Sequence, residues 1–161
     1  WAGDSRAYRI TDTAIERLTE DHSWVMEQVR AGVLTLEEAD THPRRNIITR
    51  CLGPEPGVTP EVRRVPLAPG DTILLCSDGL TGPIPDAEIA QAVRGNAPSL
   101  ACRDLLSLAN ERGGPDNITV AVIRADGLIR DVPECADTAP DLTAPSPDEA
   151  PKRPRWSLFG H

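Results

Sequence analysis

The sequence predicts an α+β protein with antiparallel strands, and two observations lead to this class. Apolar residues recur at every second position in some segments and at every third or fourth in others, which are the periods of strands and helices. Strands come first along the chain, helices follow them, and a last strand returns to the sheet. Strands and helices that are segregated in this way favour an α+β fold over alternating parallel units.

The first half of the chain is predicted to form a hairpin, two short helices and two further strands. The hairpin turns at Thr11-Asp12-Thr13, where polar residues separate two short apolar runs. Ser23 and Thr35 each precede an amphipathic run and are therefore the expected N-caps of helices. In chain order the expected elements are strands at 6–10 and 14–18, helices that end at Gly32 and before Pro43, and strands at 46–50 and 61–65.

The second half is predicted to hold the most apolar strand, a pair of helices and the returning strand. The apolar strand spans residues 72–76. Asp86 begins the first helix, and Ser99 caps the second, which Gly113 ends. The returning strand is expected over residues 118–123, where two sets of side chains alternate between two faces.

Proline and acidic residues set the C-terminal part of the chain apart. Residues 131–161 hold six of the sixteen prolines. Residues 131–154 have hardly any large apolar side chain, so this part cannot bury enough surface to offset its ordering entropy. We therefore divide the chain into a domain over residues 1–126 and a Pro-rich, acidic, disordered tail over residues 127–161. The basic and aromatic end of the tail, KRPRWSLFGH, is either a frayed terminus or a docking motif.

The composition excludes several classes of function. Seventeen basic against twenty-five acidic residues leave a net charge of −8, which disfavours binding to nucleic acid or to an anionic membrane. No apolar run approaches the roughly eighteen residues that a membrane span needs, and no signal peptide is evident. The four cysteines are far apart and form no C-x-x-C pair, so they favour a reducing, cytoplasmic location over a disulfide or zinc framework.

Three aspartates stand where a predicted strand meets a turn, and they are the candidate site residues. Asp4 lies in the segment GDSR before the first strand, Asp78 in CSDGL after the apolar strand, and Asp116 in GGPDN before the returning strand. Gly79 is expected to permit a sharp turn after Asp78. Taken singly, each aspartate is typical of a turn residue that bonds its own backbone.

Taken together, the three carboxylates favour a metal site. Without neighbouring Cys or His ligands they suit hard, oxygen-preferring cations such as Mg²⁺ or Mn²⁺. Two such ions a few ångströms apart lower the pKa of a shared water and neutralise the oxygens of an in-line displacement at phosphorus. The pattern therefore indicates phosphate chemistry, and the spacing alone leaves open whether the three aspartates meet.

Five motifs, in order, resemble the C-terminal half of the catalytic domain of the metal-dependent PPM (type 2C) serine/threonine protein phosphatases, of the bacterial type. The motifs are GDSRAYR, LTEDHS, HPRRNIITRCLG, GDTILLCSDGLTG and RGGPDNITVAVI, which cover about residues 1–125. The resemblance implies the C-terminal half of a PPM-type antiparallel β-sandwich, with helices outside its two sheets. It also implies a centre of two Mn²⁺ or Mg²⁺ ions, with a third in bacterial members, at one end of the sandwich.

The same resemblance assigns roles residue by residue. Asp78 and Asp116 match metal-centre aspartates of the family, and Asp4 matches the aspartate that holds a third, looser ion together with the aspartate of SDG. Residues 21–46 match a flap beside the active site, and we interpret the histidines in it as surface or packing residues. No catalytic residue is expected within this chain, since a metal-activated water is the nucleophile, and no substrate-binding residue is assigned.

One motif of the family is missing from the sequence. The Asp-Gly-His-Gly stretch, which in the family carries the metal-bridging aspartate and the proposed general acid, has no counterpart among these residues. We therefore interpret the chain as a fragment, with an incomplete centre, of a phosphatase whose general acid lies upstream. The isolated fragment is expected to show no Mn²⁺-dependent hydrolysis.

The resemblance implies phosphoserine and phosphothreonine proteins as substrates, and a Hanks-type serine/threonine kinase as a partner. Two other hypotheses stay open. A catalytically inactive PPM-like protein would act as a binding or regulatory module, although the retained Asp78 and Asp116 argue against it. A scaffold protein would use its tail to dock a kinase or a receptor.

Overall fold

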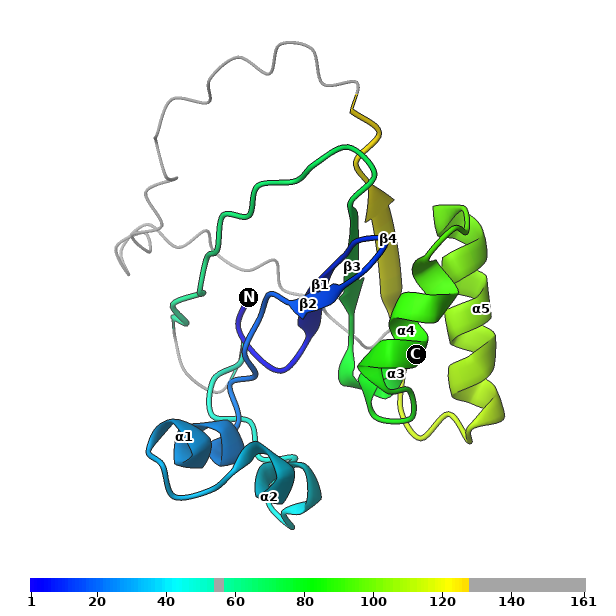
Figure 1. Ribbon diagram of the computed structural model, residues 1–161. Coiled ribbons are helices and arrows are strands. Elements are labelled where there is room, and N and C mark those ends of the chain that lie inside the picture. The colour runs from blue at the N-terminus through cyan, green and yellow to red at the C-terminus, as the bar shows by residue number, and fades with distance from the viewer. Residues whose placement is uncertain (54–56, 128–161) are drawn as a thin grey trace, which may run out of the picture. The chain divides into compact units, whose positions relative to one another are not determined.

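The structure is a computed structural model that describes residues 1–53 and 57–127. The tail predicted over residues 127–161, with its KRPRWSLFGH end, lies outside the described residues except for Gly127. The described chain contains helices and one antiparallel sheet (Figure 1). This arrangement confirms the predicted α+β class.

The sheet has its strands in the order β2-β1-β3-β4, and each strand is antiparallel to its neighbours. Arg6 of β1 pairs with Cys76 of β3, and Cys76 pairs in turn with Val120 of β4. The start of β1, the end of β3 and the start of β4 therefore meet at the same end of the sheet. The strands are β1 (Arg6–Ile10), β2 (Ile15–Arg17), β3 (Thr72–Cys76) and β4 (Val120–Arg124).

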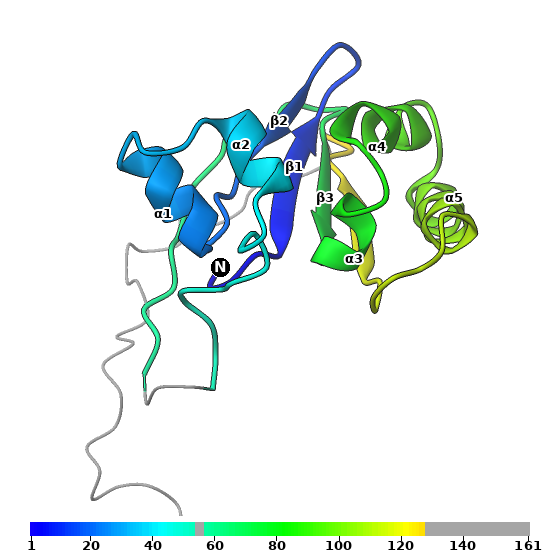
Figure 2. The ribbon, with the colours of Figure 1, turned by 90° about the horizontal axis from the view of Figure 1, so that it is seen from below.

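Three helices, α3, α4 and α5, lie on one side of the sheet, and the other two, α1 and α2, form a separate pair beside β1 and β2 (Figure 2). As predicted, Ser23 and Thr35 cap the separate pair: the Ser23 hydroxyl accepts from the Met26 amide, and Thr35 forms a capping box with Glu38. None of the described helices is long and apolar enough to cross a bilayer. In chain order the helices are α1 (Trp24–Arg30), α2 (Leu36–Thr41), α3 (Asp78–Thr81), α4 (Asp86–Val93) and α5 (Pro98–Glu111).

The hydrophobic core lies between one face of the sheet and the helices α3, α4 and α5. Alternate side chains of each strand enter it, because neighbouring residues of a strand point to opposite faces. The opposite face keeps apolar side chains exposed, with Leu75 at 43% and Ile123 at 56%, as expected of one half of a two-sheet sandwich. The buried members of the core are Tyr8, Ile10, Leu74, Cys76, Leu80, Ile84, Ile89, Ala90, Val93, Ala101, Leu105 and Ala109.

The buried Tyr8 forms hydrogen bonds with two charged residues, Arg6 and Asp86. The Tyr8 hydroxyl donates to Asp86 Oδ1 over 3.0 Å, and Arg6 Nη1 donates to the Tyr8 oxygen over 3.4 Å. Burial raises the pKa of Tyr8 to about 12 against an opposing effect of Arg6, and burial also raises the pKa of Cys76 to about 11. Both groups are therefore uncharged in the folded protein well into the alkaline range.

Alkaline pH is expected to destabilise the fold between about pH 9 and about pH 12, because the folded state keeps two protons there that the unfolded chain loses. Tyr8 is the one tyrosine of the chain, so phenolate absorbance reports its titration alone. We expect a midpoint near 12 in the folded chain and near 10 in denaturant. A folded-state midpoint near the denaturant value would contradict the buried position of Tyr8.

Two predicted strands and one predicted helix boundary were wrong. In the described chain Ile48 makes only an isolated bridge to Ser23, and residues 61–65 form no strand. A strand needs a neighbouring strand for its backbone groups, whereas Glu61 exchanges its backbone hydrogen bonds with Trp1, which lies outside the described strands. The helix α5 begins at Pro98 and not after Ser99, since proline at the first helical position has the φ that a helix requires.

Candidate metal centre

The structure brings the three predicted aspartates to the same end of the sheet. Asp4 precedes β1 by two residues and Asp78 follows β3 by two, and the register of these strands sets the two aspartates opposite each other. Asp116 lies in the loop that leads into β4. The strand β4 pairs with the edge of β3 that does not pair with β1. We call this end of the sheet, defined by Asp4, Asp78 and Asp116, the carboxylate end.

Asp4 and Asp78 interact electrostatically. Asp4 is half-buried, and burial raises the pKa of its carboxyl group above the ordinary value. The negative charge of Asp78 raises this pKa further, while a backbone hydrogen bond and the charge of Arg6 act in the opposite direction. The raised pKa means that the ionised form of Asp4 is disfavoured in this position.

The basic groups of the described chain compensate this repulsion only in part. Arg6 is the nearest arginine in sequence, but its Nη2 pairs with Asp21 Oδ2 at 2.8 Å. Among the described residues, no basic side chain forms an ion pair with Asp4 or Asp78. Two carboxylates in this arrangement would be stabilised by a bound cation.

Ser77 ties the end of β3 to the loop that carries Asp116. Its hydroxyl donates to the carbonyl of Asn117 over 3.1 Å and accepts from the amide of Thr119 over 3.0 Å. Its own amide donates to the carbonyl of Thr119 over 3.1 Å. These three bonds keep Asp78, the next residue along the chain, beside the Asp116 loop. Sequence reasoning missed this role, and the serine of the SDGL motif was the signal that could have indicated it.

Gly79 lets the two segments approach closely. A Cβ at this position would lie 2.4 Å from the carbonyl oxygen of Asn117 and 3.0 Å from its carbonyl carbon. The prediction that Gly79 permits a sharp turn is wrong, because Gly79 lies within the helix α3. Only a residue without a side chain fits between this helix and the Asp116 loop.

Asp116 is exposed and partly engaged with its own loop. Its Oδ1 accepts from the amide of Asn117 over 2.7 Å, which is the bond of a turn-forming aspartate. Such a bond leaves a carboxylate with further acceptor positions, since its two oxygens offer about four lone pairs. Asp116 therefore stabilises its own loop through this hydrogen bond and can still bind a cation.

The donor set at the carboxylate end fits Mg²⁺ or Mn²⁺ in kind, because both prefer carboxylate oxygens and keep several waters. The number of described side chains that come together here is too small for a complete site. Within residues 1–53 and 57–127, no three His, Cys, Asp or Glu side chains come close enough to hold a metal ion together. The described residues thus offer the pair Asp4 and Asp78, with Asp116 on the adjoining loop, as part of a centre.

The segment predicted as a flap, residues 21–46, contains α1 and α2. His22, at its start, is buried, with 4% of its surface exposed. His42 lies against Trp24 with ring centroids 5.1 Å apart, and the guanidinium of Arg44 lies 5.1 Å from the same ring of Trp24. The position of this segment beside an active site remains a prediction.

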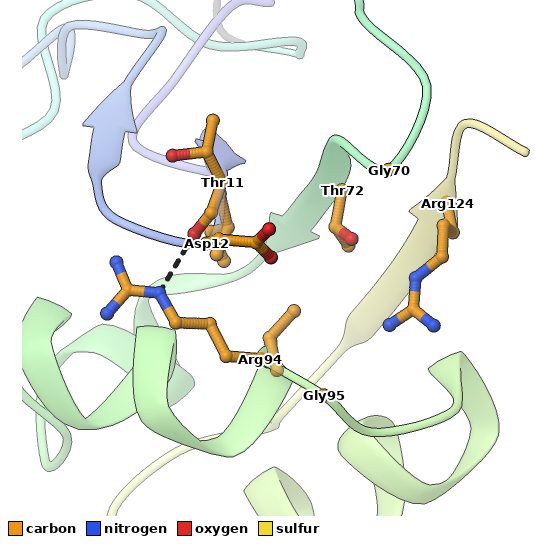
Figure 3. Close-up of a pocket in the computed structure, with 9 residues that line it drawn as sticks. Thr11, Asp12, Gly70, Thr72, Arg94, Gly95 and Arg124 are labelled. Carbon is orange, nitrogen blue, oxygen red and sulfur yellow. Dashed lines mark hydrogen bonds between the residues drawn. The ribbon is translucent and has the colours of Figure 1, made fainter. Parts of the chain in front are cut away.

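A hollow of about 220 Å³ lies at the other end of the sheet, away from the three aspartates. Its wall includes Thr11 of the β1–β2 turn and Arg94, which follows α4. Arg94 Nε donates to the carbonyl of Thr11 over 2.9 Å, as Figure 3 shows. This hollow shares no residue with the carboxylate end and is not part of the candidate centre.

Comparison with known proteins gives consistent matches. Residues 29–126 match the family model described as Stage II sporulation protein E (SpoIIE). The serine/threonine phosphatase stp of Listeria monocytogenes is 42% identical over 125 residues, which are 77% of this chain and 50% of that protein. The chain therefore spans about half the length of the curated relatives that it matches.

Solved structures agree with these matches. The PPM Ser-Thr phosphatase MsPP from Mycobacterium smegmatis, in complex with cacodylate, is 45% identical with a TM-score of 0.69, and the match covers 76% of this chain and 53% of that one. The catalytic domain of the phosphatase PstP, in complex with two manganese ions, is 37% identical with a TM-score of 0.57, and the match covers 75% and 50%. The predicted fold is confirmed by these likenesses.

Proposed function

The chain belongs to the PPM family of bacterial serine/threonine protein phosphatases, and from this premise we propose that residues 1–126 form part of a metal-dependent phosphatase domain. The reaction is the hydrolysis of phosphoserine and phosphothreonine in proteins. The observation that carries the proposal is the meeting of Asp4 and Asp78, beside the Asp116 loop, at one end of the sheet.

Three carboxylates of this chain would hold the metal ions. Asp78 and Asp116 are proposed ligands of a pair of Mn²⁺ or Mg²⁺ ions, and Asp4 with Asp78 of a third. The ions would activate the attacking water and offset the negative charge of the phosphate. The two manganese ions of the PstP structure support this choice of metal. Ser77 and Gly79 hold the start of α3, which carries Asp78, beside the loop that carries Asp116.

The proposed partners are proteins that carry phosphoserine or phosphothreonine, and a Hanks-type kinase that phosphorylates them. The names of the relatives support the substrate class. We further propose a cytoplasmic location. Cys51, Cys76 and Cys102 are free thiols in the structure, which suits a reducing compartment.

An activity measurement tests the proposal in two arms. The 161-residue chain with Mn²⁺ is expected not to hydrolyse p-nitrophenyl phosphate, because it has no Asp-Gly-His-Gly stretch. A chimera that joins the N-terminal half of the Listeria phosphatase to this chain is expected to hydrolyse a phosphothreonine peptide in Mn²⁺. Asp78→Asn is expected to abolish that activity, and Asp104→Asn, on the exposed surface of α5, to preserve it.

Two results would contradict the proposal. Robust turnover by the 161-residue chain, lost on Asp78→Asn, would show that its centre is complete. A folded chimera that binds the phosphopeptide without hydrolysing it would favour the alternative, a catalytically inactive PPM-like binding or regulatory module.

A further inference from the structure

His22 holds the backbone of Gly3 at both of its polar groups. The amide of Gly3 donates to His22 Nδ1 over 3.0 Å, and the amide of His22 donates to the carbonyl of Gly3 over 3.0 Å. His22 is 4% exposed, so bulk water competes little for these bonds. Because Gly3 immediately precedes Asp4, His22 fixes the chain one residue before the carboxylate.

The conformation of Gly3 needs this support. Its φ is +129°, in a region that residues with a side chain rarely adopt. A glycine can also leave this region at little cost, since it lacks the Cβ that restricts other residues. The two hydrogen bonds to His22 remove that freedom and keep the bend that leads into Asp4.

A second set of contacts fixes the ring of His22. Nε2 lies 3.1 Å from Glu61 Oε1, and Arg50 Nη1 lies 3.3 Å from Nε2 and donates to the same carboxylate oxygen over 3.2 Å. Because the amide of Gly3 can only donate, Nδ1 is the acceptor, and the Nε2–H group donates a hydrogen bond to Glu61 Oε1. The ring of Trp1 stacks on His22 with centroids 6.0 Å apart and planes 8° apart.

We propose that His22 is a positioning residue of the metal centre, which holds Gly3 so that the carboxylate of Asp4 stays opposite Asp78. Glu61 favours the tautomer of His22 with the proton on Nε2, which leaves Nδ1 free to accept from the amide of Gly3. Outer-shell carboxylates fix the tautomer of histidines in metal sites in the same way. The inference rests on the proposed function only in so far as Asp4 is a metal ligand. It also links the predicted flap to the centre, because α1 begins at Trp24, two residues after His22.

Amide hydrogen exchange and Mn²⁺ titration of the 161-residue chain test this role. His22→Ala is expected to speed exchange of the Gly3 amide about tenfold, since one buried hydrogen bond is lost. It is expected to weaken Mn²⁺ binding about tenfold or more, as the loss of an outer-shell partner does. His22→Asn offers an amide oxygen in place of Nδ1 and is expected to preserve both properties. His42→Ala, a matched control on the same segment, is expected to change neither.

A double-mutant cycle separates positioning from general stability. In an Asp4→Asn background, His22→Ala is expected to cause no further loss of Mn²⁺ affinity, whereas a general destabilisation would still cause one. The proposal is overturned if the exchange rate of the Gly3 amide is unchanged in His22→Ala. It is also overturned if the double variant loses as much Mn²⁺ affinity as Asp4→Asn and His22→Ala lose together. If the parent chain binds no Mn²⁺, the proposed metal centre fails, and the Gly3 exchange rate still decides whether His22 holds the bend.

Discussion

The Asp78→Asn variant is expected to be more stable than the parent chain in metal-free buffer and to bind Mn²⁺ more than about 100-fold more weakly. Stability rises because the charge of Asp78 disfavours the ionised form of Asp4, and that repulsion disappears. Affinity falls because a direct ligand is lost, which costs more than the roughly 10–100-fold effect of an outer-shell partner. Urea unfolding without metal and calorimetric titration with Mn²⁺ measure the two effects.

The gain in stability should depend on pH. Asp4 has a raised pKa in the folded state, so its ionisation costs stability as the pH rises through that value. The advantage of Asp78→Asn is therefore expected at neutral pH and should vanish in acid, where Asp4 is protonated. Asp104→Asn is the matched control, since Asp104 is exposed on α5. A variant at Asp78 that is less stable and binds Mn²⁺ normally would contradict both effects.

Gly79→Ala is expected to destabilise the chain by about 3 kcal/mol, the upper end of the usual cost of overpacking. The added Cβ would lie 2.4 Å from the carbonyl oxygen of Asn117, and this backbone atom cannot rotate away as a side chain can. The Asp116 loop must therefore move away from α3, and the hydrogen bonds of Ser77 to that loop should weaken. Denaturant unfolding measures the cost, and amide shifts of residues 116–119 report the movement of the loop.

Gly82→Ala provides the comparison for this prediction. Gly82 has a φ of −63°, and a Cβ there would lie 3.3 Å from the carbonyl oxygen of Asp78. This contact is tight but needs only a small shift, so we expect a cost below about 1 kcal/mol, as for a tolerated substitution. Equal costs at the two glycines would show that Gly79 is not required for the close approach.

The elements with a local signal were predictable from the sequence. The apolar run of β3 was predicted with its observed bounds, Thr72–Cys76, and the caps Ser23 and Thr35 were identified from the polar residue before each amphipathic run. The absence of a strand at 61–65 was not predictable, because alternation indicates a strand only where another strand lies beside it. The short helix α3 was missed, since four residues carry too little periodicity to be detected.

The three aspartates could be proposed as site residues from the sequence, but their arrangement in space could not be predicted. They could be picked out because each stands near the end of a strand, but their placement at the same end of the sheet follows from the register of β1 with β3 and of β3 with β4. The groups that hold them in place lie far away along the chain. His22 bonds Gly3 across 19 positions, and Ser77 bonds Asn117 across 40. No local pattern encodes such pairs.

The carboxylate end of the sheet is expected to bind Mn²⁺. Paramagnetic line broadening in amide spectra of the 161-residue chain, at substoichiometric Mn²⁺, tests this claim most directly because it reports location as well as binding. We expect broadening centred on Asp4, Asp78 and Asp116, which Asp78→Asn removes, and sharp signals at Thr11 and Gly70 at the opposite end of the sheet. Broadening that is centred elsewhere, or that persists unchanged in Asp78→Asn, would contradict this claim.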